Sequence, residues 1–561
     1  MSQADGHSGN GGARHEAAPL GVIVRGSLSD GLRMRLNDDT SVEDLRVGKF
    51  VVIEGERARF FAMINDVELS ATHPGFLDNP PRSGLASDVL RGSSIYGSVR
   101  LRPMLMAPRE ADGAPSQDLL PVKTIPSHFS AVAEATRDDV RTVFGDERED
   151  AAYFHVGEPL DMDTPVCLNL DRWIERSNAI FGKSGTGKTF LTRLCLCGAI
   201  KAEKAVHLIF DMHNEYGEKG TNEGQGDRTV YGLRNHFQSR VQIFTLDPKS
   251  SQRRGVRSDH QVRIPYSQLD VEDVLLLQRE LNLSATAVET CYLLERALGE
   301  AAWFGTFLSW DADAIAAFCE THNAHAGALA ALQRKLGYLV RQCRDFLVEN
   351  LADGDDAVSR ILGALQSGKN IVLEFGQYNR PVQYMLVANI LTRRLHKEYV
   401  DRKEAAMGSA AAEPRPLVIV IEEAHKFLSP QLAGQTIFGT IARELRKYNV
   451  TLLIVDQRPS GIDDEVLSQV GTKICCLLDD DKDVDAVLTG VGGANMLRGV
   501  LASLDTRQQA LIFGHAVPMP IVVRTRNYDE TFYRAMRHNG ESGDQKTLAE
   551  RVARTIDLDF A

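Results

Sequence analysis

Residues 182–189 read GKSGTGKT, and this segment limits the possible folds more than any other part of the chain. It matches the pattern GxxxxGK[ST] in full and stands between the apolar run NAIF and the helix-like run FLTRLCLCGAI. Glycines let the backbone approach phosphate oxygens closely, and a helix that follows directly turns its positive N-terminal end towards them. A chance glycine-rich turn does not need that strand–loop–helix context. The segment therefore predicts an α/β domain that binds a nucleoside triphosphate.

The loop also predicts a role for its individual residues. Lys188 is expected to neutralise the β- and γ-phosphates, and Thr189 to offer its hydroxyl to Mg²⁺. The predicted nucleotide-binding residues here are Gly182, Lys183, Ser184, Gly185, Thr186, Gly187, Lys188, Thr189 and Phe190.

A second apolar run, LVIVIEEAH at 417–425, ends in two carboxylates. A buried strand that delivers acids to its carboxyl edge beside a phosphate loop holds the magnesium shell and aligns the attacking water. We assign Glu422 to the magnesium side and Glu423 to the polarisation of water. The other reading, two solvated acids that end a strand, ignores the phosphate loop upstream. His425 either takes part in this site or only packs and hydrogen-bonds there.

The segment IARELRKYNVTLLIVDQRPSGI at 441–462 predicts a basic helix followed by another buried strand. Gln457 ends that strand, where an amide can sense the γ-phosphate or orient the water. Arg443, Arg446 and Lys447 precede the strand, and such arginines can reach the nucleotide of a neighbouring subunit. The alternative for each of them is a solvated basic face. We expect at least one to stabilise the charge that develops during phosphoryl transfer.

The segment DMHNEY at 211–216 follows a further apolar run. Asp211 and Glu215 should emerge at the same sheet edge as the phosphate loop. Two readings stay open, because such acids either lie beside the nucleotide or cap the next turn.

The pattern of apolar runs organises the chain after about residue 150. Runs rich in Val, Ile and Leu without alternation are typical of parallel strands covered on both faces. The predicted strands are NAIFGKS, AVHLIFDMH, VQIFTL, NIVLEFG, LVIVIEEAH, VTLLIVDQ, TKICCLL and QALIFGH. Between about residues 266 and 360 the pattern is helical, which predicts a helical insertion into this α/β domain.

The N-terminal part has a different pattern, in which short segments rich in β-forming residues are separated by turn residues. Val51 and Ile53, then Phe60, Ala62 and Ile64, alternate with more polar neighbours, as in half-buried strands. We predict a flexible tail at 1–18, a small N-terminal β-barrel at 19–130 and a helical, charged connector at 131–155. The α/β domain then covers 156–530, and a helical tail covers 531–561.

Charge and cysteine content restrict the partners and the compartment. Asp and Glu outnumber Lys and Arg by 76 to 64, so any contact with nucleic acid must be concentrated in a local basic lining. Candidates are Arg253, Arg254 and Arg257 in one loop and Arg393, Arg394 and Lys397 in another cluster, although either can be a solvated basic face. The eight cysteines form no CxxC pair, and no apolar stretch is long enough to span a membrane, so we expect reduced thiols and a cytoplasmic protein.

Taken together, these segments resemble the HerA family, the HerA–FtsK branch of RecA-like P-loop ATPases. The resemblance rests on RSNAIFGKSGTGKT, DMHNEY, VIEEAH, RELRKYNV and VDQRPSGIDDEVLSQVGTKI in this order, with the β-rich N-terminus in the place of the family barrel. It implies a RecA-like P-loop core and matches Arg176 and, in the FGH segment, Gly514 and His515 to positions near the nucleotide. The family often has glycines where this chain has Leu445 and Asn449.

The resemblance also implies function and partners. It predicts a homohexamer that uses ATP and Mg²⁺, with hydrolysis at the subunit interfaces, to drive double-stranded DNA through a central channel. It further implies an effector docked on the barrel, either a nuclease or a SIR2-like NAD-consuming subunit, in antiviral defence or DNA end processing. The leading alternative is an ATP-binding ring that acts as a scaffold and activates its effector without translocation. A secretion or conjugation ATPase and a P-loop kinase are further alternatives.

Overall fold

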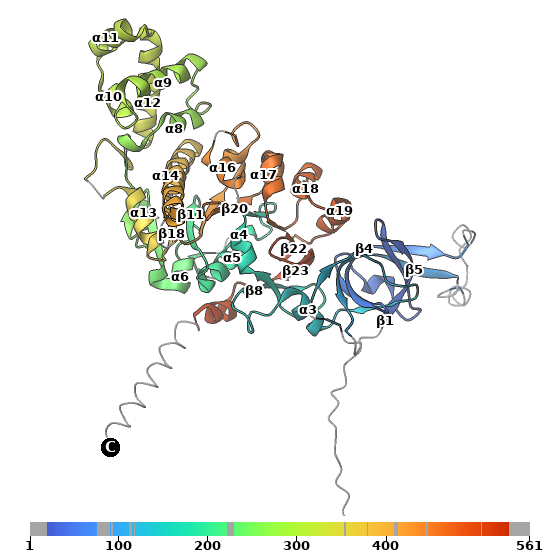
Figure 1. Ribbon diagram of the computed structural model, residues 1–561. Helices are drawn as coiled ribbons and strands as arrows, with labels where there is room; N and C mark the ends of the chain where they lie inside the picture. Colours follow the sequence, from blue (N-terminus) through green and yellow to red (C-terminus); the bar gives the residue numbers. More distant parts are fainter. Residues whose placement is uncertain are drawn as a thin grey trace, which may run out of the picture. The chain divides into compact units, whose positions relative to one another are not determined.

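The computed structural model describes residues 19–537 except for 74, 76–89, 91–93, 111–114, 117, 222–228, 353–354, 379, 409–412, 435, 444–446 and 507. The predicted tail at 1–18, most of the predicted tail at 531–561, and Arg446 therefore lie outside the described residues; 531–537 are helical. The chain divides into two compact units, Met1–Phe144 with Pro159–Pro165 and Gly145–Glu158 with Val166–Ala561 (Figure 1).

The first unit is a closed β-barrel followed by one helix. Its strands are hydrogen-bonded in the order β2-β1-β7-β3-β4-β5, and β5 pairs back with β2. The short β6 pairs with β5 beside this closed sheet. The elements are β1 (Pro19–Ser27), β2 (Gly31–Leu36), η1 (Val42–Asp44), β3 (Phe50–Glu54), β4 (Ala58–Ala71), β5 (Ile95–Pro108), β6 (Leu120–Pro121), β7 (Ala131–Glu134) and α3 (Arg137–Phe144).

The barrel core follows the alternation of its strands. All five apolar residues predicted to face inwards from β3 and β4 are in that core. Residues 131–134, predicted as the start of a helical connector, instead form β7 between β1 and β3. Val132 of β7 is fully buried in the barrel, and a four-residue run of small side chains is too short to show a strand period in the sequence.

The second unit contains a twelve-stranded sheet in the order β15-β14-β18-β11-β19-β20-β10-β21-β22-β23-β8-β9. All eight predicted strands are confirmed, as β10, β11, β14, β18, β19, β20, β21 and β22 in chain order. The strands are β8 (Tyr153–Pro159), β9 (Val166–Asn169), β10 (Asn178–Phe181), β11 (Val206–Asp211), β14 (Val241–Thr245), β15 (His260–Gln261), β18 (Asn370–Glu374), β19 (Leu417–Glu422), β20 (Val450–Asp456), β21 (Thr472–Cys475), β22 (Gln509–Gly514) and β23 (Ile521–Thr525).

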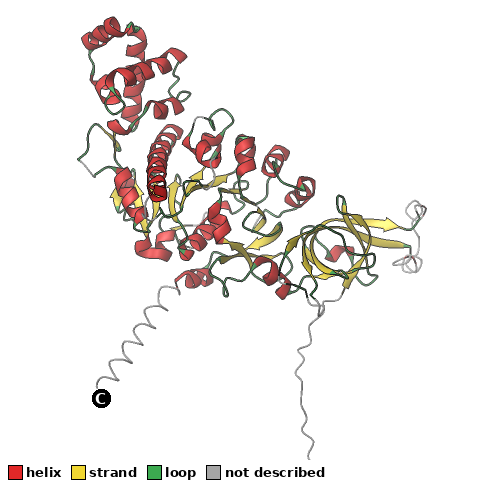
Figure 2. Cartoon of the chain, in the orientation of Figure 1, coloured by secondary structure: helices red, strands yellow, loops and turns green. Residues whose placement is uncertain are grey.

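Strand direction determines which residues meet at one edge of this sheet. β10 lies between β20 and β21 and is parallel to both, and β19 lies beyond β20, also parallel. The carboxyl ends of β10, β19 and β20 are therefore at the same edge. Helices cover both faces, with α5 and α6 on one side and α14 and α16 on the other (Figures 1 and 2).

Helices connect these strands in the usual α/β manner. Two small antiparallel strands, β12 (Gly220–Thr221) and β13 (Thr229–Val230), lie outside the main sheet. The connecting elements are α4 (Leu170–Glu175), α5 (Lys188–Ala202), α6 (Leu233–Phe237), η2 (Gln238–Arg240), α7 (Pro248–Arg253), α13 (Ala357–Gln366), α14 (Pro381–Gly408), α15 (His425–Leu428), α16 (Ile437–Arg443), η4 (Pro459–Gly461), α17 (Asp464–Gln469), α18 (Asp481–Leu488) and α19 (Ala494–Ala502).

The predicted helical insertion is present. Its elements are η3 (Tyr266–Gln268), α8 (Val271–Leu276), α9 (Ala285–Leu298), α10 (Trp303–Ser309), α11 (Ala312–His322) and α12 (Ala326–Gln342). A parallel pair of two-residue strands, β16 (Ile264–Pro265) and β17 (Leu347–Val348), joins the two ends of the insertion, and such short strands have no sequence signature. All eight cysteines are free, seven of them buried. None of the helices in the described ranges is long and apolar enough to cross a membrane.

Candidate active site

The phosphate loop lies where the sequence predicted it, between β10 and α5. Gly187 caps the N-terminus of α5 with a φ of +94°, a left-handed conformation that favours glycine. Gly182 is needed for space, because a Cβ there would lie 2.7 Å from the Cβ of Cys476 and 2.8 Å from Thr186 Oγ1. Thr186 Oγ1 donates to the carbonyl of Lys183 at 2.7 Å, which closes the loop. The loop amides and the N-terminal end of α5 thus form an anion-binding concavity.

Lys188 stands in the first turn of α5 and lines the pocket described below. Its Nζ donates to the carbonyl of Lys183 at 3.3 Å. Burial lowers the pKa of Lys188, although the charges of Glu423 and Asp456 act in the opposite direction. A bound polyphosphate would strengthen that opposing effect and favour the charged ammonium.

Glu422 ends β19 and is only 7% exposed. Two buried tyrosines hold it: Tyr216 OH donates to Glu422 Oε1 at 2.9 Å, and Tyr384 OH donates to its backbone carbonyl at 3.0 Å. Burial, with a smaller effect from the charge of Asp211, raises the pKa of Glu422 to about 8. Within the described chain, Glu422 Oε2 is buried without a hydrogen-bond partner.

That unpaired oxygen fits a cation. The described residues hold no group of three or more His, Cys, Asp or Glu side chains arranged as a metal site. Mg²⁺ at nucleotide sites takes most of its ligands from phosphates and water and needs only one or two from the protein. Thr189 and Glu422, which both line the pocket, would supply them.

Glu423 has a φ of +50°, a conformation uncommon for a residue with a side chain. Gln457, at the end of the neighbouring β20, fixes this side chain by donating its Nε2–H to Glu423 Oε1 at 2.8 Å. His425 lies beside them, with Nε2 at 3.8 Å from Glu423 Oε2. Its other ring nitrogen lies 3.0 Å from the buried Asp456, and this hydrogen bond raises the pKa of His425. The two predicted water-activating residues thus meet at the pocket, with His425 as their neighbour.

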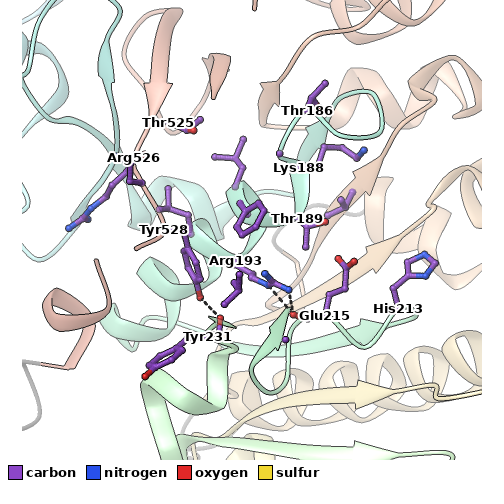
Figure 3. Close-up of a pocket in the computed structure, with 18 of the residues that line it drawn as sticks. Thr186, Lys188, Thr189, Arg193, His213, Glu215, Tyr231, Thr525, Arg526 and Tyr528 are labelled. Carbon is purple, nitrogen blue, oxygen red and sulfur yellow. Dashed lines mark hydrogen bonds between the residues drawn. The ribbon is translucent and has the colours of Figure 1, made fainter. Parts of the chain in front are cut away.

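A pocket of about 2240 Å³ extends from the phosphate loop across this edge of the sheet (Figure 3). Its far wall is the segment from Thr525 to Thr531, which follows β23 and which the sequence analysis did not single out. β23 runs antiparallel to β22, which runs antiparallel to β21, so the carboxyl end of β23 is at the same edge as the phosphate loop. Tyr528 approaches Phe190 of α5 with ring centroids 6.2 Å apart. The aromatic run NYDETFY was the available signal for this wall.

Arg193 is a second residue that sequence reasoning missed. It is 7% exposed, and its Nε donates to the carbonyl of Glu215 at 2.9 Å (Figure 3). Its guanidinium lies 5.5 Å from the ring centroid of Phe190. An arginine within the apolar helical run FLTRLCLC was the signal that it has a partner inside the protein.

The DMHNEY segment divides between the two readings. Asp211 is fully buried and accepts the backbone N–H groups of Glu215 and Tyr216, each at 2.8 Å, so it caps the turn. Burial raises the pKa of Asp211 to about 7. Glu215, in contrast, lines the nucleotide pocket.

Three residues matched through the family resemblance lie elsewhere in this chain. Arg176 and Gly514 both adjoin Gly471, which precedes β21, and His515 N donates to the carbonyl of Gly471 at 2.8 Å. His515 Nε2 lies 2.7 Å from Glu175 Oε2. These residues are at the amino edge of β10 and β21, opposite the phosphate loop, so they do not reach a nucleotide held by their own chain.

The predicted trans-acting arginines are described only in part. Arg443 ends α16, and its Nε lies 3.3 Å from Glu465 Oε2. It is not among the residues that line the nucleotide pocket of its own chain. Asn449, where the family often has glycine, has a φ of +59°, and asparagine tolerates this conformation better than most residues.

The two basic clusters differ in their surroundings. Arg393 pairs with the buried Asp273 at 2.5 Å, and Arg394 donates to the carbonyl of Gln268 at 3.0 Å, so both attach the helical insertion to α14. The side chains of Arg393 and Arg394 are therefore paired with groups of their own chain. In the other cluster Arg253 and Arg257 are exposed.

A phosphate loop after a central parallel strand, with two adjacent acids, one of them buried, at the end of a nearby strand, defines a P-loop ATPase. The family model described as "Helicase HerA, central domain" matches residues 154–395. Over these residues the chain is similar to HerA-family helicases.

Relatives extend the match beyond that domain. The DNA double-strand break repair helicase HerA of Sulfolobus acidocaldarius is 24% identical over 504 residues, which cover 88% of this chain and 92% of that protein. Its namesake from Pyrococcus furiosus is 24% identical over 385 residues, 65% of this chain and 68% of that protein. The namesake from Sulfurisphaera tokodaii is 31% identical over 194 residues, 34% of this chain and 38% of that protein.

Among solved structures, the chain matches VirB4 of Thermoanaerobacter pseudethanolicus with a TM-score of 0.45 and 13% identity over 67% of this chain and 97% of that one. The plasmid coupling protein TrwB in complex with the non-hydrolysable GTP analogue GDPNP gives a TM-score of 0.42 and 13% identity. That match covers 64% of this chain and 88% of the TrwB chain.

Proposed function

We propose that this chain is an ATP-driven translocase of double-stranded DNA that works as a homohexamer in the cytoplasm. One observation carries the proposal: Glu423 and Gln457 form a hydrogen-bonded pair at the edge of the sheet where the phosphate loop opens. A carboxylate and an amide held together at this edge are suited to orient a water molecule towards a γ-phosphate. The named relatives, which are DNA repair helicases, support DNA as the substrate.

In this proposal each residue acts on the nucleotide from a fixed position. The loop amides and Lys188 hold the phosphates, and Thr189 with Glu422 would hold Mg²⁺, which neutralises phosphate charge when bound. Glu423 accepts the proton of the attacking water, while Gln457 keeps the carboxylate aligned. Phe190 and Tyr528 offer aromatic faces for the base at the far end of the pocket.

The hexamer and the trans-acting arginine belong to the same proposal. Arg443 lies outside the pocket of its own chain, which is what an arginine that serves a neighbouring subunit requires. Arg446 shares this predicted role. Arg176, Gly514 and His515, at the opposite edge of the sheet, could contact nucleotide only across such an interface.

We further propose that an effector, a nuclease or a SIR2-like NAD-consuming subunit, docks on the barrel, in antiviral defence or DNA end processing. The exposed apolar residues of the first unit support a docking surface, since Leu69 is 77% and Phe129 74% exposed. Leu69→Glu with Phe129→Glu should abolish co-elution with such an effector and leave ATP hydrolysis intact. An effector that still co-elutes would place its docking site elsewhere.

The deciding experiment measures ATP hydrolysis by the purified protein with and without linear double-stranded DNA, with the mass in solution recorded on the same sample. A hexamer that DNA stimulates supports translocation. A hexamer that hydrolyses ATP without regard to DNA would favour the scaffold alternative and refute the translocase.

Two variants test the site itself. Lys188→Ala should lose nucleotide binding, because the phosphates lose their principal cation. Glu423→Gln should bind nucleotide with the affinity of the parent and lose turnover, because an amide cannot accept the proton of water. Tight binding by Lys188→Ala would disprove the phosphate-loop assignment.

A further inference from the structure

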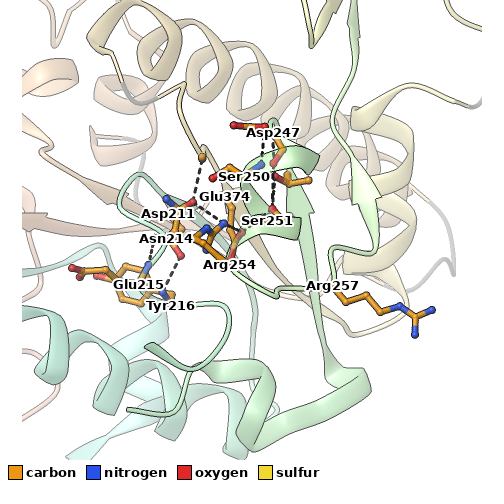
Figure 4. A network of polar contacts seen from close by, with 12 residues as sticks. Asp211, Asn214, Glu215, Tyr216, Asp247, Ser250, Ser251, Arg254, Arg257 and Glu374 are labelled. Carbon is orange, nitrogen blue, oxygen red and sulfur yellow. Dashed lines mark hydrogen bonds and ion pairs between the residues drawn. The ribbon is translucent and has the colours of Figure 1, made fainter. Parts of the chain in front are cut away.

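A network of polar contacts connects the nucleotide pocket with α7 and the basic loop that follows it (Figure 4). Its centre is Glu374, the fully buried last residue of β18. Glu374 Oε2 accepts from Arg254 Nη2 at 2.5 Å and from Ser251 Oγ at 3.3 Å. Arg254 is the C-cap residue that follows α7, so its side chain returns from the end of this helix to the edge of the sheet.

The same guanidinium also reaches the wall of the pocket. Arg254 Nη2 lies 3.4 Å from Asn214 Oδ1, and that oxygen accepts the backbone N–H of Gly376 at 3.1 Å. Asn214 lines the pocket and has a φ of +58°. Arg254 therefore links α7 to the turn at 213–216.

That turn leads directly to the catalytic edge. The carboxylate of Asp211 holds this turn, because it accepts hydrogen bonds from the backbone N–H groups of Glu215 and Tyr216. Tyr216 then donates to Glu422 at 2.9 Å. A continuous series of contacts thus runs from α7 to the acid pair that faces the nucleotide.

The other end of the network faces solvent. Arg253 and Arg257 stand on either side of Arg254 in the chain and are exposed, and Figure 4 shows Arg257 directed away from the network. Asp247 holds α7 in place, since its Oδ1 caps the helix at Ser250 N, 3.0 Å away. Arg253 at the end of the anchored α7 and Arg257 in the loop that follows are two exposed guanidinium groups, and they suit the phosphates of a nucleic acid backbone.

The centre of the network has a second arrangement available. Glu374 Oε1 is buried and accepts no hydrogen bond from the described residues. A guanidinium can pair with both oxygens of a carboxylate. If Arg254 paired with both oxygens of Glu374, it would release Asn214 and the turn that lines the pocket.

We propose that Arg254 is a positioning residue that transmits the nucleotide state of the pocket to the Arg253–Arg257 segment, and phosphate contact at that segment back to the pocket. The proposal rests on the proposed function for its ligand, the DNA backbone. The coupling itself depends on the contacts of Arg254 and of the turn at 213–216, and not on DNA.

The test therefore begins without DNA. Hydrogen exchange of residues 248–257 is measured in the full-length protein with and without a non-hydrolysable ATP analogue. The parent should show a change of at least about threefold in the exchange rate on nucleotide binding. Arg254→Lys keeps a cation beside Glu374 but cannot span to Asn214, so it should lose most of this change while nucleotide affinity stays within about threefold. Arg253→Gln, the matched neighbour, should retain it.

A parent that shows no nucleotide-dependent change, or an Arg254→Lys variant that retains it, overturns the proposal. If Arg254→Lys does not fold, Asn214→Gly makes the same test, because glycine accepts the left-handed φ and removes the acceptor of Arg254, together with the hydrogen bond from Gly376 N–H. DNA stimulation of ATP hydrolysis is then measured separately. Absent stimulation in the parent refutes the proposed function, whereas intact stimulation with unchanged exchange refutes this inference alone.

Discussion

Two buried tyrosines contact the same glutamate in different ways, and this allows a controlled test of the acid pair. Tyr216 bonds the carboxylate of Glu422 and Tyr384 bonds its backbone carbonyl, and both side chains are fully buried. Replacement of either by Phe keeps the ring and removes one hydroxyl. When a buried acceptor loses its hydrogen-bond donor, the free energy of unfolding decreases by about 1–3 kcal/mol. Both variants should therefore lose a similar amount of stability.

Their effects on turnover should differ. Tyr216→Phe leaves both oxygens of the Glu422 side chain without a hydrogen bond from the described residues, because Oε2 already has none. If the displaced carboxyl group raises the activation free energy by about 1.4 kcal/mol, the rate of hydrolysis falls roughly tenfold. Tyr384→Phe leaves the side-chain contact in place and should reduce turnover by less than about twofold.

The assay is steady-state ATP hydrolysis at saturating nucleotide, with urea denaturation of the nucleotide-free protein as the measure of stability. Equal losses of turnover in both variants would mean that stability alone controls the rate. A Tyr216→Phe variant with normal turnover and reduced stability would show that the orientation of Glu422 does not limit hydrolysis. Either result refutes the reasoning.

The remaining predictions concern the stability of the second unit. His207 is buried, and burial lowers its pKa to about 4. Between about pH 6.5 and 4 the unfolded chain therefore binds a proton at this residue that the folded chain does not bind. The free energy of unfolding is highest above about pH 6.5 and falls as the pH is lowered through this window. In urea midpoints, His207→Gln should reduce the acid-induced loss of stability over this window by about 3 kcal/mol, whereas exposed His322→Gln should not. Gly514→Ala should cost at least about 2 kcal/mol, because φ is +116° and the new Cβ would lie 2.2 Å from the carbonyl oxygen of Gly471. Gly363→Ala, in α13 with open space around it, should instead stabilise by about 0.5–1 kcal/mol, and a loss there would contradict the argument.

The sequence predicted the parts of the ATPase whose chemistry is local. The glycines of the phosphate loop, the apolar run before it and the paired acids of VIEEAH each occupy a few consecutive residues, so spacing alone assigned them to strands and loops. The eight buried strands were predicted for the same reason, since continuous runs of Val, Ile and Leu are long enough to be recognised.

The features that the sequence did not predict depend on the order and direction of strands that lie far apart in the chain. The aromatic run around Tyr528 does not by itself indicate that β23 ends at the phosphate-loop edge, because two antiparallel connections, β21 to β22 and β22 to β23, set that position. Arg176 and His515 were matched to the nucleotide site through family motif positions, and the direction of β10 places both at the edge opposite the phosphate loop of their own chain. β7 was missed because its four residues complete a barrel whose other strands lie far away in the chain.

The parallel pair β16 and β17 has a consequence for how this chain can vary. Chain segments paired in a sheet lie about 4.8 Å apart, so the insertion leaves the ATPase almost where it entered. The ATPase sheet is therefore insensitive to the length of what lies between those strands. The contacts of Asp270 and Asp273 with Arg393 bind α8 to the same base. The segment from about residue 277 to 346 is therefore replaceable in principle, because another compact domain inserted between the same two strands would leave the ATPase sheet unchanged.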